Sequence, residues 1–104
     1  MFKLLLAFLL AINVSLVYAQ EDEPHFSCGT RALIYEEVVK LREEKKYSEI
    51  DVLRGLAKYL YLRNTPLDEA KEIVTEAQRA YEDRSLTSKN VFLFYLKKCP
   101  GDEV

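Results

Sequence analysis

Two cysteines at opposite ends of the chain constrain the fold most strongly. Cys28 lies in "HFSCGT" and Cys99 lies 71 positions later, and the sequence contains no third cysteine. Two cysteines allow one intramolecular pairing, and such a pairing persists in an oxidising compartment. In the chain-entropy account, closing a loop of about 70 residues stabilises a fold by roughly 4 kcal/mol. Whether the thiols pair therefore depends on where the chain resides.

Residues 1–19 have the pattern of a signal peptide. Lys3 supplies a positive charge, Leu4 to Val17 forms an apolar segment, and Val17-Tyr18-Ala19 fits the small-residue rule for signal peptidase. The apolar segment is shorter than the roughly 18 residues or more that a membrane span needs. We predict cleavage after Ala19 and export to the periplasm or the medium, with a retained membrane helix as the alternative. Export in turn predicts a Cys28–Cys99 disulfide, with free or intermolecular thiols as the alternative.

The charge balance argues against several partners. All of the acidic residues follow position 19 and Lys3 is the only basic residue before it, so removing residues 1–19 changes the net charge from −2 to −3, with His25 neutral. A nucleic-acid-binding domain would show a basic excess, and an amphipathic segment bound to anionic lipid would show a basic face. We therefore expect no nucleic-acid partner and no membrane association after cleavage. A chain this short forms one domain with a small core.

Helical periodicity divides the domain into four segments. A first helix is predicted from about residue 28 to 46, and a second from an N-cap at Ser48 to the stop at residues 63–66. A third is predicted from an N-cap at Thr65, with Pro66 as its first helical residue. The second helix is expected to bury Ile50, Val52, Leu53, Leu56, Ala57, Leu60 and Tyr61. The third is expected to bury Leu67, Ala70, Val74, Ala77 and Tyr81.

The fourth segment is the apolar run "VFLFYL", residues 91–96. A run of this length and composition is compatible with a buried strand, but no other segment alternates like a strand that could pair with it. We predict a short helix that is buried on several sides, including Phe92, and is the central core element. Ser85 or Thr87 is expected to cap it.

These segments predict an all-α fold, a compact bundle of about four short helices closed by one disulfide. Residues 20–27 are expected to form a disordered acidic lead, residues 28–99 the helical domain and residues 100–104 a C-terminal tail.

The sequence offers no clear catalytic or metal-binding motif. His25, Cys28 and Cys99 could in principle ligate a metal, but a disulfide beside a histidine in the lead fits an oxidised compartment better. Small exported glycan hydrolases use paired carboxylates. The candidate acids Glu36, Glu37, Glu69 and Glu72 are all expected on solvated helix faces. We predict no cofactor, no metal and no catalytic residue.

Tyrosine is the enriched residue type, with seven in the sequence. Aromatic side chains with a polar end are favoured at binding surfaces. Tyr47 and Tyr59 fall outside the predicted apolar stripes, so with Arg63 they are the predicted contact patch. The other tyrosines are expected to cover the edges of a small core.

The pattern of the domain resembles a group of small exported two-cysteine helical proteins of bacteriophages and proteobacteria, which have no assigned activity. The residues that carry the resemblance are Cys28, Arg42, Ile73, Val74, Ala77, Tyr81, Phe92 or Phe94, and Cys99. The chain departs from that pattern in "QRAYEDR", where relatives often have a proline after the tyrosine, and in the position of Gly55. The resemblance implies export, a helical fold, a disulfide and a bacterial or phage origin, and it implies no mechanism.

The predicted function is that of an exported, non-enzymatic protein that binds another protein as an inhibitor, immunity factor, chaperone or assembly factor. It is expected to be a monomer or a small homo-oligomer. Two alternatives remain at this point: a small cell-envelope glycan hydrolase that uses surface carboxylates, and a structural accessory of an envelope or virion complex.

Overall fold

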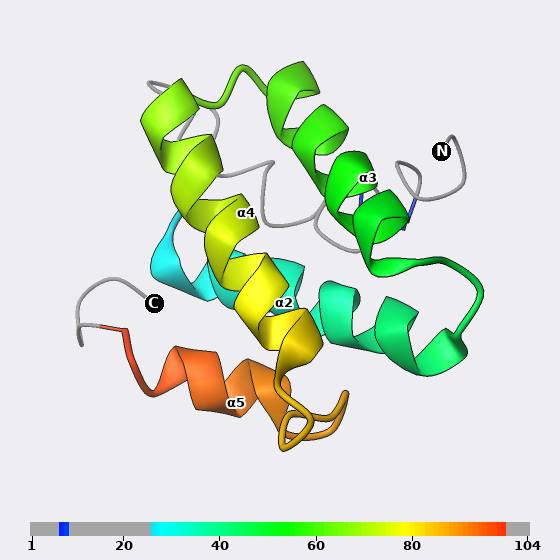
Figure 1. Cartoon of the computed structure of the whole chain (residues 1–104). Helices are drawn as coiled ribbons and strands as arrows, with labels where there is room; N and C mark the ends of the chain where they lie inside the picture. Colours follow the sequence, from blue (N-terminus) through cyan, green and yellow to red (C-terminus); the bar gives the residue numbers. More distant parts are fainter. Residues whose placement is uncertain (1–6, 9–25, 100–104) are drawn as a thin grey trace.

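The computed structural model describes residues 7–8 and 26–99, and four helices account for most of this part (Figure 1). They are α2 (Cys28–Glu44), α3 (Glu49–Leu62), α4 (Leu67–Glu82) and α5 (Val91–Leu96). Helix is the only regular secondary structure within these residues, which confirms the all-α prediction. Among the described residues, no helix is both long enough and apolar enough to span a bilayer.

Helix α2 is the central element. It packs against α5, α4 and α3, and α5 lies along it on the side away from α3 (Figure 1). The helix begins where the Ser27 hydroxyl accepts a hydrogen bond from the Thr30 N–H at 3.1 Å, and it ends where Lys45 takes a φ of 60°. Its inner face includes Ile34, Val38 and Val39, which are fully buried. The predicted helix over residues 28–46 is therefore confirmed, apart from its last two residues.

Helices α3 and α4 form an antiparallel hairpin joined by residues 63–66 (Figure 1). The Ser48 hydroxyl accepts a hydrogen bond from the Asp51 N–H at 3.2 Å, which confirms Ser48 as the N-cap of α3. The predicted cap of α4 is wrong. Pro66 occupies the N-cap position without a side-chain hydrogen bond, and the helix begins at Leu67. Because Pro66 has no side-chain acceptor, the start of α4 is fixed by the proline backbone rather than by a capping box.

The last helix is not the central core element that its composition predicts. Val91 and Tyr95 are buried, but Leu93 is 56 % exposed, Phe94 is 39 % exposed and Phe92 is only partly buried. The helix makes fewer than two turns, so only residues one turn apart can face α2. The predicted caps are also absent: Asn90 is the N-cap residue, without a side-chain bond to the helix.

The disulfide prediction is confirmed. Cys28 and Cys99 are bonded with Cα atoms 5.7 Å apart, so the first residue of α2 is tied to the residues that follow α5. Both thiols belong to this bond, and no free cysteine remains.

The segment before α2 also contributes to the core. Phe26 and Phe8 are buried, and their rings lie 6.2 and 6.1 Å from the ring of Tyr59 in α3. Phe26 and Ser27 are ordered parts of the fold, so the predicted disordered lead is wrong for these two residues. Residues 20–25, most of the predicted signal peptide and the 100–104 tail lie outside the described residues.

Candidate binding surface

The predicted contact patch does not form. Tyr59 is fully buried, so the prediction that it is exposed is wrong. Tyr47 is partly buried against the core in the connection between α2 and α3, whereas Arg63 caps the far end of α3. At 1.5 Å per residue, a 14-residue helix separates these two positions by about 20 Å. The three residues therefore do not share one surface.

An apolar groove lies instead along the junction of α3 and α4. Its volume is about 560 Å³. It is lined by Ala57, Tyr61, Thr65, Leu67, Ala70, Lys71, Val74 and Thr75. Tyr61 is 79 % exposed and Leu67 is 69 % exposed, which makes them the most exposed large apolar side chains among the described residues. Large apolar side chains that are exposed to water beside a groove are typical of an interaction surface.

The groove exists because each helix buries only part of its predicted apolar stripe: Val52, Leu56 and Leu60 of α3 and Ala77 of α4 are buried as predicted. In α3 the buried residues are Val52, Gly55, Leu56, Tyr59 and Leu60. In α4 they are Glu69, Ile73, Ala77 and Ala80. Part of each predicted apolar stripe, including Tyr61 and Leu67, is consequently left outside and lines the groove. Ile50, Ala57 and Tyr61 all belong to the stripe predicted for α3 and all are exposed, so that stripe is too broad: it covers two faces of the helix, and only one of them is buried.

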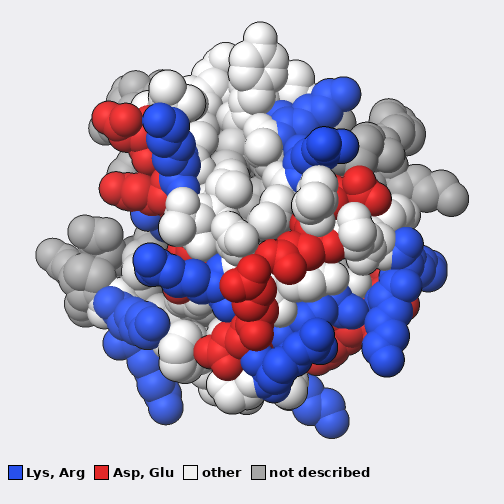
Figure 2. Space-filling model, viewed as in Figure 1, with Lys and Arg blue, Asp and Glu red and all other residues white. Residues whose placement is uncertain are grey.

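Basic side chains border the groove. Lys71 belongs to its lining, and Arg54 and Lys58 are exposed on the turns of α3 that carry Ala57 and Tyr61. Figure 2 shows an uncharged band that descends from the α3–α4 connection between the two helices, with Lys and Arg side chains on both sides and Asp and Glu side chains beyond them and at its lower end. Among the described residues that line the groove, Lys71 is basic and none is acidic. The surface thus combines an apolar floor with basic side chains next to it.

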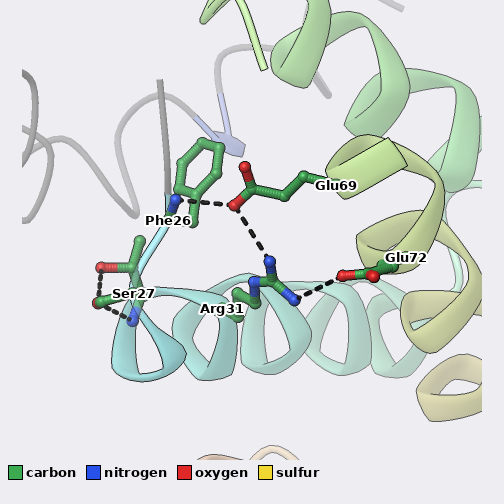
Figure 3. Close-up of polar contacts among 6 residues, drawn as sticks. Phe26, Ser27, Arg31, Glu69 and Glu72 are labelled. Atoms are coloured by element: carbon green, nitrogen blue, oxygen red, sulfur yellow. Dashed lines mark hydrogen bonds and ion pairs between the residues drawn. The ribbon is translucent and has the colours of Figure 1, made fainter. Parts of the chain in front are cut away.

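A buried carboxylate fixes the start of α4 against the start of α2 (Figure 3). Glu69 accepts a hydrogen bond from the Phe26 N–H at 2.9 Å and from the Arg31 guanidinium at 3.1 Å. Its side chain is only 9 % exposed, so the prediction that Glu69 lies on a solvated face is wrong. The physical reason is that Arg31 and the Phe26 amide, both distant in sequence, compensate the burial of the charge.

We expect Glu69→Ala to lower the free energy of unfolding by about 2 kcal/mol, because two donors, one of them charged, lose their acceptor. Urea denaturation measures this change. Glu72→Ala is the matched control, since Glu72 contacts the same guanidinium at 3.4 Å but is 68 % exposed. That exposed pair should contribute less than about 1 kcal/mol. Equal effects of the two substitutions would contradict a structural role for the buried carboxylate.

Arg42 joins the end of α4 to the loop that follows it. Its Nη1 donates to the carbonyl oxygens of Ala80, Tyr81 and Asp83 at 3.4, 3.2 and 3.0 Å, and its Nη2 donates to the carbonyl oxygen of Leu86. The side chain is buried. A cation at the C-terminal end of a helix satisfies carbonyls that have no partner within the helix and interacts favourably with the helix dipole. Arg42 is therefore a structural residue that holds α4, and hence one wall of the groove, on α2.

Burial of the Glu37 side chain has a clear effect on its ionisation. Burial raises its pKa from 4.5 to about 7; the charge of Lys40 opposes this rise, and Glu44 and Glu36 add to it. Glu43, further along α2, behaves in the opposite way. Hydrogen bonds from Ser88, including its N–H at 2.9 Å, lower the pKa of Glu43.

These two shifts predict opposite pH dependences. Because the folded-state pKa of Glu37 lies above its ordinary value, the folded state resists ionisation, and stability decreases as the pH rises from about 4.5 to 7. We expect Glu37→Gln to match the wild type at pH 4 and to be more stable than the wild type at pH 8. Glu43→Gln should instead be less stable than the wild type at pH 8. Denaturation at both pH values measures the effects, and the same sign for both variants would contradict the assignment.

Residues 7–8 and 26–99 contain no group of three or more His, Cys, Asp or Glu side chains that could hold a metal ion.

Comparison with protein families, with curated proteins and with solved structures gave no match, so the resemblance to exported phage and proteobacterial proteins stays a prediction.

Proposed function

We propose that the protein is an exported, non-enzymatic module that binds another protein through the groove between α3 and α4. The observation that carries the proposal is the pairing of a hollow of about 560 Å³ with the highly exposed Tyr61 and Leu67 at its border. Burial of these side chains against a partner would stabilise the complex through the hydrophobic effect, which the isolated protein lacks at this surface.

Two observations support export. Residues 1–19 have the order of charged, apolar and small-residue segments that signal peptidase recognises. The Cys28–Cys99 bond is of the kind that persists in oxidising compartments. Cell fractionation, with mass measurement of the exported form, tests this part: a protein that keeps residues 1–19 and is recovered from the cytoplasm would contradict it.

Site-directed photo-crosslinking in the producing cells tests the binding surface. A photoreactive residue replaces Tyr61 or Thr75 in the groove, and Lys40 or Lys89 on other faces for comparison. We expect a discrete heavier product from the first two positions and none from the other two. The product from position 61 should disappear in a variant carrying Ala57→Gln and Thr75→Gln, which we call the filled-groove variant. Both substituted positions are exposed, so this variant should fold normally.

Products that form equally from all four positions, or that persist in the filled-groove variant, would overturn the proposal.

The hydrolase hypothesis has a separate test. Glu36→Gln, Glu37→Gln and Glu72→Gln should leave the biological activity of the folded protein intact, and the loss of activity without loss of stability in any one of them would favour an enzyme.

A further inference from the structure

We propose that the occupant of the α3–α4 groove is an amphipathic helix of a partner protein, with acidic residues on both sides of its apolar stripe. This inference rests on the proposed function and specifies the chemistry of the partner. Three properties of the groove carry it: its shape, its floor and its charge.

The shape favours a helix. The antiparallel helices α3 and α4 are joined by a short connection (Figure 1), and the groove is lined by residues of both. An amphipathic helix that lies in an apolar groove is a recurring mode of peptide recognition. Two other modes of peptide recognition lack their requirements here. The described residues contain no strand edge to which a peptide strand could be added. A proline-rich peptide needs a groove lined with aromatic side chains, and among the described residues that line this groove Tyr61 is the only aromatic one.

The floor allows a helix to approach closely. Ala57 comes from α3 and Ala70 from α4, while the large side chains Tyr61 and Leu67 stand at one end. Helix axes pack at about 8–10 Å, and the distance depends on the side chains at the contact. The groove is therefore narrowly filled in its middle, where the residues are small. A partner helix could pack there the apolar side chains that it carries at spacings of three and four residues.

The charge selects an acidic helix. Lys71, Arg54 and Lys58 border the groove, and within the described residues none of the three forms an ion pair. Two exposed acids, Asp68 and Glu72, also lie near Lys71 in the sequence of α4, but neither lines the groove, and Glu72 pairs with Arg31 of α2. Complementary charge steers association and sets specificity, whereas like charges in apposition disfavour it. A second copy of this chain would place the same basic side chains against those of the first copy, so the groove suits a different protein.

Fluorescence anisotropy with a defined probe tests the proposal. The probe is a labelled, stapled amphipathic helix of about four turns, with leucines at positions i, i+3, i+7 and i+11 and glutamates beside them. The comparison peptide has lysines in place of the glutamates. At low salt we expect the full chain to bind the glutamate peptide at least tenfold more tightly than the lysine peptide. Lys71→Glu should reduce binding of the glutamate peptide at least tenfold, and the exposed Lys40→Glu on α2 should leave it unchanged. The filled-groove variant should lose both peptides.

The possible failures are distinguishable. Equal or tighter binding of the lysine peptide would overturn the acidic partner but leave the groove as a binding surface. Binding of neither peptide, with crosslinks at Tyr61 that the filled-groove variant abolishes, would overturn the helical occupant alone. Peptide binding that survives in the filled-groove variant would overturn both this inference and the proposed function. Sedimentation that shows a dimer of the wild type and a monomer of the filled-groove variant would identify a second copy as the occupant and would also overturn the inference.

Discussion

Arg42→Ala should lower the free energy of unfolding by about 3 kcal/mol or more, because the substitution removes a buried charged donor whose partners lose their hydrogen bonds. The guanidinium donates to four backbone carbonyls, at Ala80, Tyr81, Asp83 and Leu86. A hydrogen bond from a charged donor contributes about 1.5–3 kcal/mol, and the carbonyls left behind are partly buried. Urea denaturation followed by circular dichroism measures the loss.

Two further variants make this expectation specific. Arg54→Ala is the matched control, because Arg54 is an exposed arginine in the middle of α3, and its removal should change stability by less than about 0.5 kcal/mol. Arg42→Lys keeps the positive charge near the end of α4 but replaces the planar fork with one nitrogen, so it should recover only part of the loss. A loss below about 1 kcal/mol in Arg42→Ala would show that the loop after α4 is held by other contacts.

Opening the disulfide should have the largest effect on stability. The Cys28→Ser/Cys99→Ser variant removes a bond that spans 71 positions, and the chain-entropy relation gives a cost of about 4 kcal/mol for a loop of that length. Small domains have total stabilities of about 5–15 kcal/mol, so this is a large share. The melting temperature should decrease by about 15 °C or more. The double substitution is preferred over a single one, because a lone thiol could form intermolecular bonds.

Differential scanning calorimetry of the wild type and the double variant measures the shift, and thiol titration under denaturing conditions checks the bond in the purified protein. The wild type should show no titratable thiol. Two titratable thiols, or a double variant that melts with the wild type, would contradict a stabilising bond between the ends of the domain.

The sequence predicts those features of the fold that depend on local patterns. Ser48 precedes α3 as the predicted N-cap, and cysteine pairing has only one solution, so the start of α3 and the disulfide follow from short stretches. The helix faces are harder to predict. α3 carries apolar residues on two sides, and only packing against α4 and Phe26 determines that Tyr59 is buried and Tyr61 is exposed.

For the same reason, the buried charges and the groove cannot be predicted from the sequence alone. Glu69 looks like any other acid in the first turn of a helix, and its burial depends on Arg31, which lies 38 positions earlier. Arg42 looks like a solvated residue of α2 until the end of α4 is placed over it. The groove combines residues of two helices and the connection between them, so it is defined only once the hairpin has formed.

If residues 1–19 are removed as predicted, the contact between Phe8 and Tyr59 links that cleavage to the stability of the core. Phe8 belongs to the segment predicted to be cleaved, yet it is fully buried with its ring 6.1 Å from that of Tyr59. In the unprocessed chain Phe8 makes this contact only in the folded state, so it stabilises that state as a bound ligand would. If cleavage occurs after Ala19, Phe8 is no longer covalently attached and can leave. The processed protein then loses that contribution to its stability and exposes part of the aromatic pair formed by Tyr59 and Phe26.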